Sequence, residues 1–457
     1  MIYTNSEAPT QHHPAYPKFR QRGLNAAPSH YLSSWQSHRA GCIGVHSANR
    51  LHFVVRFRDS FNEAALREGF RDIVDKHDIL RAWVVDRDER PWIEFHAPPD
   101  RLIQEFDLTG LAEDRRGNAG HDLASNFIWK RFDFEKNFLW RSALIRVSNH
   151  VTIFAFVLHH FLGDLHTLAG IRKELLLKYT QGSHGQGEQK KEAAALQYSD
   201  YLLSIDEWIS SPAGQLALSN SCNSLVEAPP LPKLEEQPLA SCAAYEFTIN
   251  KDLQKAVEQL SSRHHVTTFT VLLAAHHLVL AHLTKCKDVT IAAVVNGRDL
   301  PALHRVAGCF VDRRYYRVRL NGAQTFRDLI ELSRESIIAD MQQPFVRFDH
   351  LQQKVIKTRG SAISAPVFNF RPQSAKHRKR GASIPPWEPY LIAPAPDMSM
   401  PGFSVDYYWM ELKDTDNGFA GHIRPKGCSP TRVLTTFESV LRLAAEDERF
   451  FLADILE

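Results

Sequence analysis

Apolar residues along this chain recur at two different periods. Short runs of β-branched and aromatic residues over 51–57 and 151–158 have the length and composition of buried strands. Between them, Ser60 and Glu63 form a capping-box pattern that predicts the start of a helix. The apolar residues after this pattern repeat at helical spacing, and they are Leu66, Phe70, Ile73 and Val74. Further strand-like runs are Leu80–Val85, Trp92–His96 and Ala143–Val147, the last forming a hairpin with 151–158.

Irregular stretches divide the pattern into segments. Residues 1–24 are polar and rich in Pro and His, so we expect a mobile N-terminal arm. Breaks at 180–192 and 227–237 contain many Gly, Gln, Lys, Pro or acidic residues. We therefore predict an N-terminal lobe over 25–180, an inter-lobe connection over 181–240 and a C-terminal lobe over 241–457.

The C-terminal lobe has its own sequence of expected elements. It is predicted to open with a strand near 244–249, followed by a helix over 251–262, a long core helix over 269–283 and a strand over 289–295. The core helix is the longest apolar stretch, but three histidines interrupt it and it falls short of the roughly 20 residues that a membrane span requires. We therefore expect no membrane association.

Composition narrows the class of protein. With 457 residues, 44% of them hydrophobic, the chain can bury more than one core, which agrees with two lobes. A net charge of only +3 argues against a nucleic-acid partner, which would need a concentrated basic face. The six cysteines are scattered without CxxC spacing, so we expect reduced thiols in a cytoplasmic protein and no metal site.

The strongest candidate for chemistry lies where the strand over 151–158 ends. His159 and His160 come directly after this strand, and Asp164 follows after a gap of three residues. A neutral imidazole can take a proton near pH 7, and a carboxylate nearby can fix the loop that presents it. The chain has 23 histidines in all, including other adjacent pairs, so two histidines that merely cap a strand are the alternative. Asp164 also suits the start of the helix marked by Leu168, Ile171, Leu175 and Tyr179.

Eight segments in a fixed order resemble the condensation domains of nonribosomal peptide synthetases, within the HHxxxDG acyltransferase superfamily. They are Lys76-His-Asp-Ile-Leu-Arg81, Arg131-Phe-Asp-Phe134 with Trp140-Arg141, Leu158-His-His-Phe-Leu-Gly-Asp164, Tyr198-Ser-Asp-Tyr201, Val266–Ala275 leading to Val295-Asn-Gly-Arg298, Ala307-Gly-Cys-Phe-Val311, Gln342-Gln-Pro-Phe345 and Ala365–Phe370. Each segment matches its family motif only approximately, but together the segments cover nearly the whole chain.

The resemblance implies a fold and a reaction. The expected fold is α/β, with two chloramphenicol acetyltransferase-like lobes arranged as a V, each a mixed sheet flanked by helices. The implied reaction moves an acyl group from the phosphopantetheine thioester of an acyl or peptidyl carrier protein to a soluble amine or alcohol, without an acyl-enzyme. The chain has no GxSxG motif, and we interpret Cys309 as a small buried apolar residue rather than a nucleophile.

The resemblance also assigns roles to residues. His160 takes the acceptor proton, as a general base or as a hydrogen-bonding positioner, and His159 supports the loop. Asp164 is expected to pair with Arg298 across the lobes, because an unpaired buried carboxylate would be costly. The backbone N–H of Leu165 is a candidate to stabilise a developing oxyanion.

Two positions depart from the family pattern. Leu165 stands where the motif has glycine, and Gly163 precedes the motif aspartate, so we expect Gly163 to supply the bend of the loop. Asp312 stands where the family has asparagine. These departures leave open a degenerate member that only binds a carrier or a tailoring enzyme.

The expected partner is a carrier protein on a separate chain. No activation or carrier module fits in the remaining residues, so we expect a free-standing condensation enzyme that meets its carrier in trans, with chain release as one form of the reaction. The basic residues Lys376, Arg378, Lys379 and Arg380 are candidates for carrier contact. Two further alternatives are a coenzyme A-dependent acyltransferase and an epimerization domain.

Overall fold

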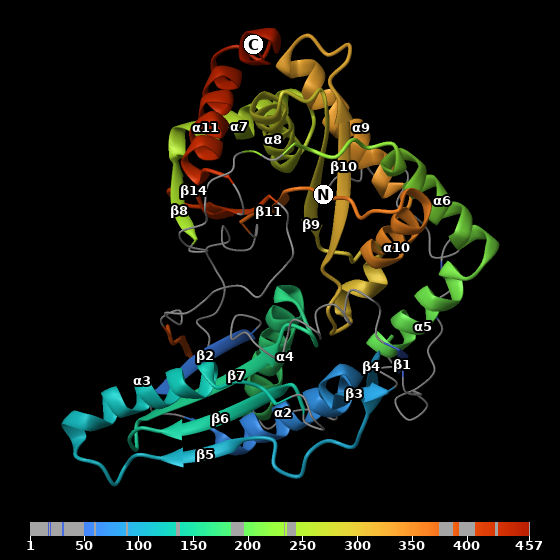
Figure 1. The fold of residues 1–457 in the computed structure, drawn as a ribbon. Helices are drawn as coiled ribbons and strands as arrows, with labels where there is room; N and C mark the ends of the chain where they lie inside the picture. Colours follow the sequence, from blue (N-terminus) through green and yellow to red (C-terminus); the bar gives the residue numbers. More distant parts are fainter. Residues whose placement is uncertain are drawn as a thin grey trace.

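The protein folds into two lobes, which Figure 1 places one above the other. The computed structural model describes residues 50–58, 61–87, 90–133, 138–183, 196–232, 244–373, 387–392, 407–425 and 428–456, with Pro17, Phe19, His30, Tyr31 and Leu234. Most of the predicted arm over 1–24 lies outside the described residues. Each lobe has a mixed sheet flanked by helices, so the predicted α/β fold class is confirmed.

The N-terminal lobe is built on a five-stranded sheet. Its strand order is β12-β2-β7-β6-β5, in which β12 is Glu388–Pro389, and only β5 and β6 are parallel. Apolar side chains alternate between the two faces, so that α2 and α4 cover one face and α3 covers the other. The elements are β2 (Arg50–Arg58), α2 (Glu63–Lys76), β5 (Gln104–Asp107), α3 (Glu113–Trp129), β6 (Trp140–Arg146), β7 (Val151–His159) and α4 (Leu165–Ser183).

Two local predictions in this lobe are corrected. Helix α2 buries its expected apolar residues but begins at Glu63, and the side chain of Asn62 accepts a hydrogen bond from the Ala65 N–H (3.0 Å). Asn62 is therefore the cap, and Ser60 lies outside the described residues. The strand predicted from Leu80 begins only at Ala82, because Asp78–Arg81 form a 3₁₀ turn. A small sheet follows, with order β1-β4-β3 (His30–Tyr31, Arg90–Phe95, Ala82–Arg87).

The C-terminal lobe is built on a six-stranded sheet with the order β10-β9-β11-β13-β14-β8. Helices α7, α8, α9 and α11 pack around its apolar core. The elements are β8 (Tyr245–Asn250), α7 (Lys251–Arg263), α8 (Thr268–Thr284), β9 (Asp288–Val295), β10 (Asp312–Arg319), α9 (Phe326–Met341), β11 (Val367–Arg371), β13 (Tyr408–Thr415), β14 (Gly418–Pro425), α11 (Pro430–Glu446) and α12 (Ala453–Leu456).

A second histidine pair lies inside this core and has a structural role. His276 and His277 of α8 are fully buried, and burial lowers their pKa values to about 3 and about 4. His276 Nε2 lies 2.5 Å from the Tyr408 hydroxyl, and His277 Nε2 lies 3.1 Å from the Tyr316 carbonyl oxygen. Both imidazoles are therefore neutral, hydrogen-bonded core residues.

Several segments join the two lobes. The connecting region contains α5 (Tyr198–Ile209) and α6 (Pro212–Val226), and α6 packs against α10 (Phe348–Arg359). Farther along the chain, β12 (Glu388–Pro389) pairs with β2 of the N-terminal lobe. The chain therefore returns to the first lobe before it completes the second sheet.

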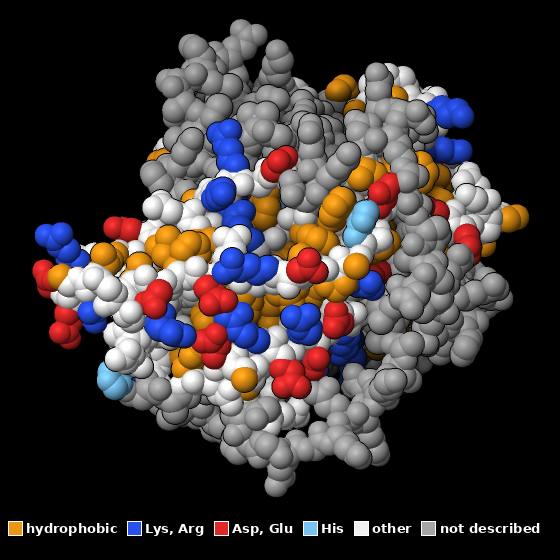
Figure 2. Space-filling model, turned by 90° about the horizontal axis from the view of Figure 1, so that it is seen from below, with side chains coloured by type: hydrophobic (Ala, Val, Ile, Leu, Met, Phe, Trp, Pro, Cys, Tyr) orange, Lys and Arg blue, Asp and Glu red, His pale blue; other side chains and the backbone are white. Residues whose placement is uncertain are grey.

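The described surface carries charged side chains of both signs. Figure 2 shows basic and acidic side chains interleaved among the described residues of the face seen from the N-terminal lobe. Within the described segments, no single helix is long and apolar enough to cross a membrane. Helices α7 and α8 meet the length and composition test only as a pair bent by 106°.

Candidate active site

The loop after β7 is held by buried residues on both sides of His160. The N–H of His159 donates to the Leu139 carbonyl (2.8 Å), and the N–H of Leu162 donates to the His159 carbonyl (2.9 Å). Phe161 and Leu162 are buried in the N-terminal core. The half-buried His160 side chain is thus presented by a turn with fixed ends.

The two histidines have different surroundings. His159 is 4% exposed, its Nδ1 accepts the Phe161 N–H (3.1 Å), and its ring meets the edge of Phe132 at 5.6 Å between centroids. An Nδ1 that accepts a hydrogen bond places the proton of neutral His159 on Nε2. His160 Nδ1 instead lies 3.8 Å from the Cys309 sulfur, which comes from the other lobe. His160 therefore lies where the two lobes meet.

Asp164 and Arg298 form a buried ion pair between the lobes. Arg298 Nη1 donates to Asp164 Oδ2, and both side chains are 0% exposed. The carboxylate also accepts the Thr167 N–H at Oδ1 (2.8 Å) and the Phe310 N–H at Oδ2 (3.0 Å). Burial alone would raise the pKa of Asp164, but the Arg298 charge and these hydrogen bonds outweigh it and lower the pKa below its usual value.

Thr167 completes this junction, although no sequence pattern singled it out. Its hydroxyl accepts from Arg298 Nη2 (2.9 Å) and donates to the Gly308 carbonyl (2.7 Å). The Arg298 guanidinium also lies 4.2 Å from the centre of the Phe310 ring. Because α4 begins at Leu165, Asp164 caps this helix and anchors the second lobe at the same time.

The glycine before Arg298 is required by the backbone. Gly297 has a φ of +67°, and a Cβ there would lie 2.0 Å from the Phe310 carbonyl oxygen. Only glycine combines this conformation with this close approach. The Asn-Gly-Arg segment therefore turns sharply enough to return Arg298 to Asp164.

Gly163 was expected to bend the motif loop, but the structure shows a different reason for a glycine at this position. The described residues with positive φ include neither Gly163 nor Leu165, so no left-handed residue shapes the motif loop. Gly163 is needed for packing, because a Cβ would lie 2.7 Å from Leu158 Cδ2 and 2.9 Å from Thr167 Cγ2. Leu165 is the first residue of α4 and 46% exposed, so its side chain fits without a glycine at this position.

We expect Gly163→Ala to be more damaging than Leu165→Gly. The added methyl group must displace Thr167, whose hydroxyl is already bonded to Arg298 and Gly308, at a cost of about 1–3 kcal/mol. Leu165→Gly removes only an exposed side chain at a helix end. Melting temperature and acyl-transfer rate of both variants test this ranking, and equal or reversed effects would contradict the packing explanation.

Two tyrosines of the Tyr198–Tyr201 segment link α5 to the second lobe. The Tyr198 hydroxyl donates to the Cys309 carbonyl (2.8 Å), and the Tyr201 hydroxyl accepts from Arg347 Nη1 (2.9 Å). Arg347 Nε lies 3.3 Å from Asp312 Oδ2. The acidic residue that replaces the family asparagine is therefore neutralised by a buried arginine.

The Lys76–Arg81 segment supports the site from a distance. The Asp78 carboxylate accepts the N–H groups of Tyr198 (3.3 Å) and Ser199 (3.0 Å) at the start of α5. His77 Nε2 lies 2.9 Å from Glu174 of α4. These contacts fix α4 and α5 relative to each other, so this segment positions the site without entering it.

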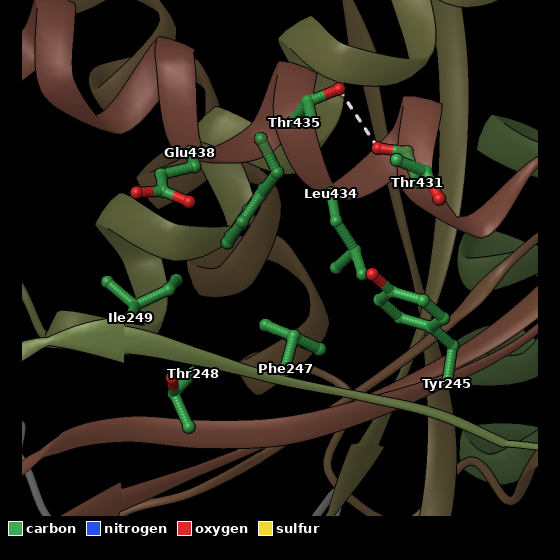
Figure 3. A pocket seen from close by; sticks show the side chains of 9 residues that line it. Tyr245, Phe247, Thr248, Ile249, Thr431, Leu434, Thr435 and Glu438 are labelled. Atoms are coloured by element: carbon green, nitrogen blue, oxygen red, sulfur yellow. Dashed lines mark hydrogen bonds between the residues drawn. The ribbon is translucent and has the colours of Figure 1, made fainter.

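The remaining candidates lie either outside the described residues or away from this arrangement. Lys376, Arg378, Lys379 and Arg380 lie outside the described residues. In the described part of the chain, no three His, Cys, Asp or Glu side chains are placed to hold a metal ion. A hollow of about 150 Å³ lies between β8 and α11, where Figure 3 shows Tyr245 and Leu434 in its lining. It contains none of the motif residues.

Comparison with known proteins identifies the family. The family model described as "Condensation domain" matches residues 43–385, which include the motif loop, Arg298 and Cys309. The chain belongs to the condensation-domain family. Malpinin synthetase of Mortierella alpina is 26% identical over 322 residues, covering 68% of this chain. The matched region spans only 4% of that synthetase, so the similarity concerns one domain of a much longer protein.

Solved structures agree on the fold. The X-domain from teicoplanin biosynthesis has a TM-score of 0.72 and 17% identity, covering 95% of this chain and 98% of its own. A condensation domain that mediates chain release from the enacyloxin polyketide synthase has a TM-score of 0.69 and 18% identity, covering 92% of this chain and 84% of its own. Condensation domains generally form amide or ester bonds, and they work with carrier proteins.

Proposed function

We propose that this condensation domain transfers an acyl group from the phosphopantetheine thioester of a carrier protein to a soluble amine or alcohol. The observation that carries the proposal is the half-buried His160, held between the lobes by a loop whose Asp164 is paired with Arg298. In this reaction the acceptor N or O attacks the thioester carbon, and His160 takes or orients the acceptor proton. The carrier thiol leaves with a proton.

Preorganisation supports this assignment of roles. A proton acceptor is effective when its ring is held within hydrogen-bond reach of the acceptor atom. In direct transfer, a proton on Nδ1, the nitrogen that faces the Cys309 sulfur, would leave Nε2 as the basic nitrogen of His160. The N–H of Leu165 belongs to the first turn of α4 and has no helical acceptor, so it remains a candidate donor to the oxyanion.

A second mechanism is favoured by the 3.8 Å contact between Cys309 and His160. A histidine can activate a neighbouring thiol, which would attack the carrier thioester and release the carrier thiol. The acyl group would then pass from Cys309 to the acceptor. Direct transfer is preferred because Cys309 is buried.

One experiment tests the proposal and separates the two mechanisms. The purified chain is mixed with a separately purified, acyl-loaded carrier and with candidate amines or alcohols, and ATP is left out. Mass spectrometry then identifies the products and measures the intact masses of both proteins. We expect an amide or ester product and no acylated chain. Cys309→Ala should retain transfer.

Each alternative has its own outcome. An acyl adduct lost in Cys309→Ala would replace direct transfer with the two-step mechanism. Transfer from an acyl-coenzyme A without any carrier would indicate a coenzyme A-dependent enzyme. No transfer with any donor, together with stable carrier binding, would leave a binding function, and a solved complex of the X-domain and OxyB from teicoplanin biosynthesis is similar in fold.

A further inference from the structure

A buried arginine lies directly beside His159, and no described residue supplies it with a counter-charge. Arg50 is the first residue of β2, and its register partner on β7 is His159. Arg50 is 8% exposed, and its buried Nη1 has no hydrogen-bond partner among the described residues. No described carboxylate forms an ion pair with Arg50. Burying a cation in this way is costly unless something pairs with it.

Two further arginines lie around Arg50. Arg141 of β6 is on the same sheet face as His159, because its register partner Val157 is two residues earlier on β7. The Arg141 guanidinium lies 4.2 Å from the centre of the Phe132 ring, and the Phe132 ring also contacts His159. The third member is the exposed Arg131, next to Phe132 in the chain.

The charges of these three residues act on one another. Burial and the charge of Arg131 lower the pKa of Arg50 to about 10, and burial and the charge of Arg50 lower the pKa of Arg141 to about 10. Arg141 donates to the carbonyl groups of Phe127 (2.9 Å) and Ile128 (3.1 Å), which are neutral acceptors at the end of α3. The cluster therefore has a surplus of positive charge.

We propose that Arg50, Arg131 and Arg141 form a subsite for a carboxylate carried by the substrate that reacts at His160. This inference rests on the proposed acyl transfer, and it adds the chemical class of the substrate. A guanidinium binds a carboxylate through paired, charge-assisted hydrogen bonds, and Arg50 has donors available for them. The carboxylate would relieve the repulsion within the cluster.

The phosphate of the carrier arm fits this position less well. Arg50 is the register partner of His159, and His160 is the next residue along the chain, so the subsite adjoins the loop that presents the proposed proton acceptor. The arm separates its phosphate from the thioester by many bonds, whereas a carboxylate on a short acyl chain or acceptor stays near the reacting atoms. The charge and the position of the cluster together favour a substrate carboxylate.

Binding of a small carboxylate tests the subsite without any acyl transfer. Melting temperature is measured with succinate, with succinamide and with chloride at matched ionic strength, for the wild type, Arg50→Met and the surface control Arg71→Met. We expect succinate alone to raise the wild-type and Arg71→Met melting temperatures. Arg50→Met should melt at or above the wild type without ligand and lose the succinate effect. Earlier melting with an unchanged succinate effect would show that Arg50 is structural.

A second variant and a rate measurement complete the test. Arg131→Gln changes an exposed residue, so it should fold normally and weaken the succinate effect. In acyl transfer, Arg50→Met should raise KM for a carboxylate-bearing substrate about 10- to 100-fold and leave its neutral amide analogue unchanged. Measuring KM with the carboxylate placed either on the acyl donor or on the acceptor shows which substrate binds the arginine cluster. Equal KM changes for acid and amide would overturn the proposal, whereas absence of transfer with a retained succinate effect would count against the proposed function alone.

Discussion

Acyl transfer by His160→Ala is expected to be about 10²- to 10⁴-fold slower than by the wild type, with nearly unchanged thermal unfolding. The expected rate loss is the range for removing a positioned proton acceptor. Stability should change little because His160 is half-buried and the turn is held by the backbone bonds of His159 and Leu162. Transfer rates from a loaded carrier, measured beside a melting curve, give both quantities.

His159→Ala provides the matched control. His159 is 4% exposed, accepts the Phe161 N–H and packs on Phe132. Its replacement by alanine should therefore lower the melting temperature more than it lowers the acyl-transfer rate of the folded protein. An amine that is already deprotonated should partly bypass the loss of His160 as the pH rises, whereas an alcohol should not. Near-wild-type turnover of an alcohol by His160→Ala would remove the catalytic assignment and support the binding function.

Breaking the Asp164–Arg298 pair is expected to cost about 3–5 kcal/mol of unfolding free energy in either single variant. Both side chains are fully buried, so Asp164→Ala leaves a guanidinium uncompensated and Arg298→Ala leaves a carboxylate uncompensated. The double variant should lose much less unfolding free energy than the two single variants lose together, because it leaves no buried charge without its partner. Chemical denaturation of the four proteins in the cycle measures this coupling.

A surface pair calibrates the measurement. Arg442 and Glu438 form an exposed ion pair on α11, for which a coupling of about 0.3–0.5 kcal/mol is expected. If the coupling between Asp164 and Arg298 were as small as this, the pair would not hold the lobes together. If a single variant expresses too poorly to purify, Asp164→Asn keeps the shape of the side chain and allows the cycle to be completed.

Elements with local signals could be predicted from the amino-acid order alone. Periodicity located β2, β7 and α2, and the adjacent strands Ala143–Val147 and 151–158 indicated the hairpin that β6 and β7 form. The order of motifs indicated the condensation-domain family, which the family match shows. These features could be predicted because strand and helix patterns, and the spacing of motifs, depend on neighbouring residues.

Contacts between distant segments could be seen only in the folded chain. Thr167 is an ordinary helix residue in the sequence, and only folding brings its hydroxyl to Arg298 and Gly308. Cys309 was interpreted as a small apolar residue, yet its sulfur lies 3.8 Å from His160 because the second lobe packs against the motif loop. Gly163 was expected to supply a bend, but the neighbours Leu158 and Thr167 are what require a glycine there.

Arg50 could not be recognised from the sequence for the same reason. As the first residue of a predicted strand it carries no local signal, and its position beside His159 depends on strand register and burial. Local patterns depend on a few neighbouring side chains, whereas the environment of a charge depends on every segment packed around it. The family and the position of the motif loop were therefore readable from the sequence, whereas the packing of the two lobes determines which polar groups meet there.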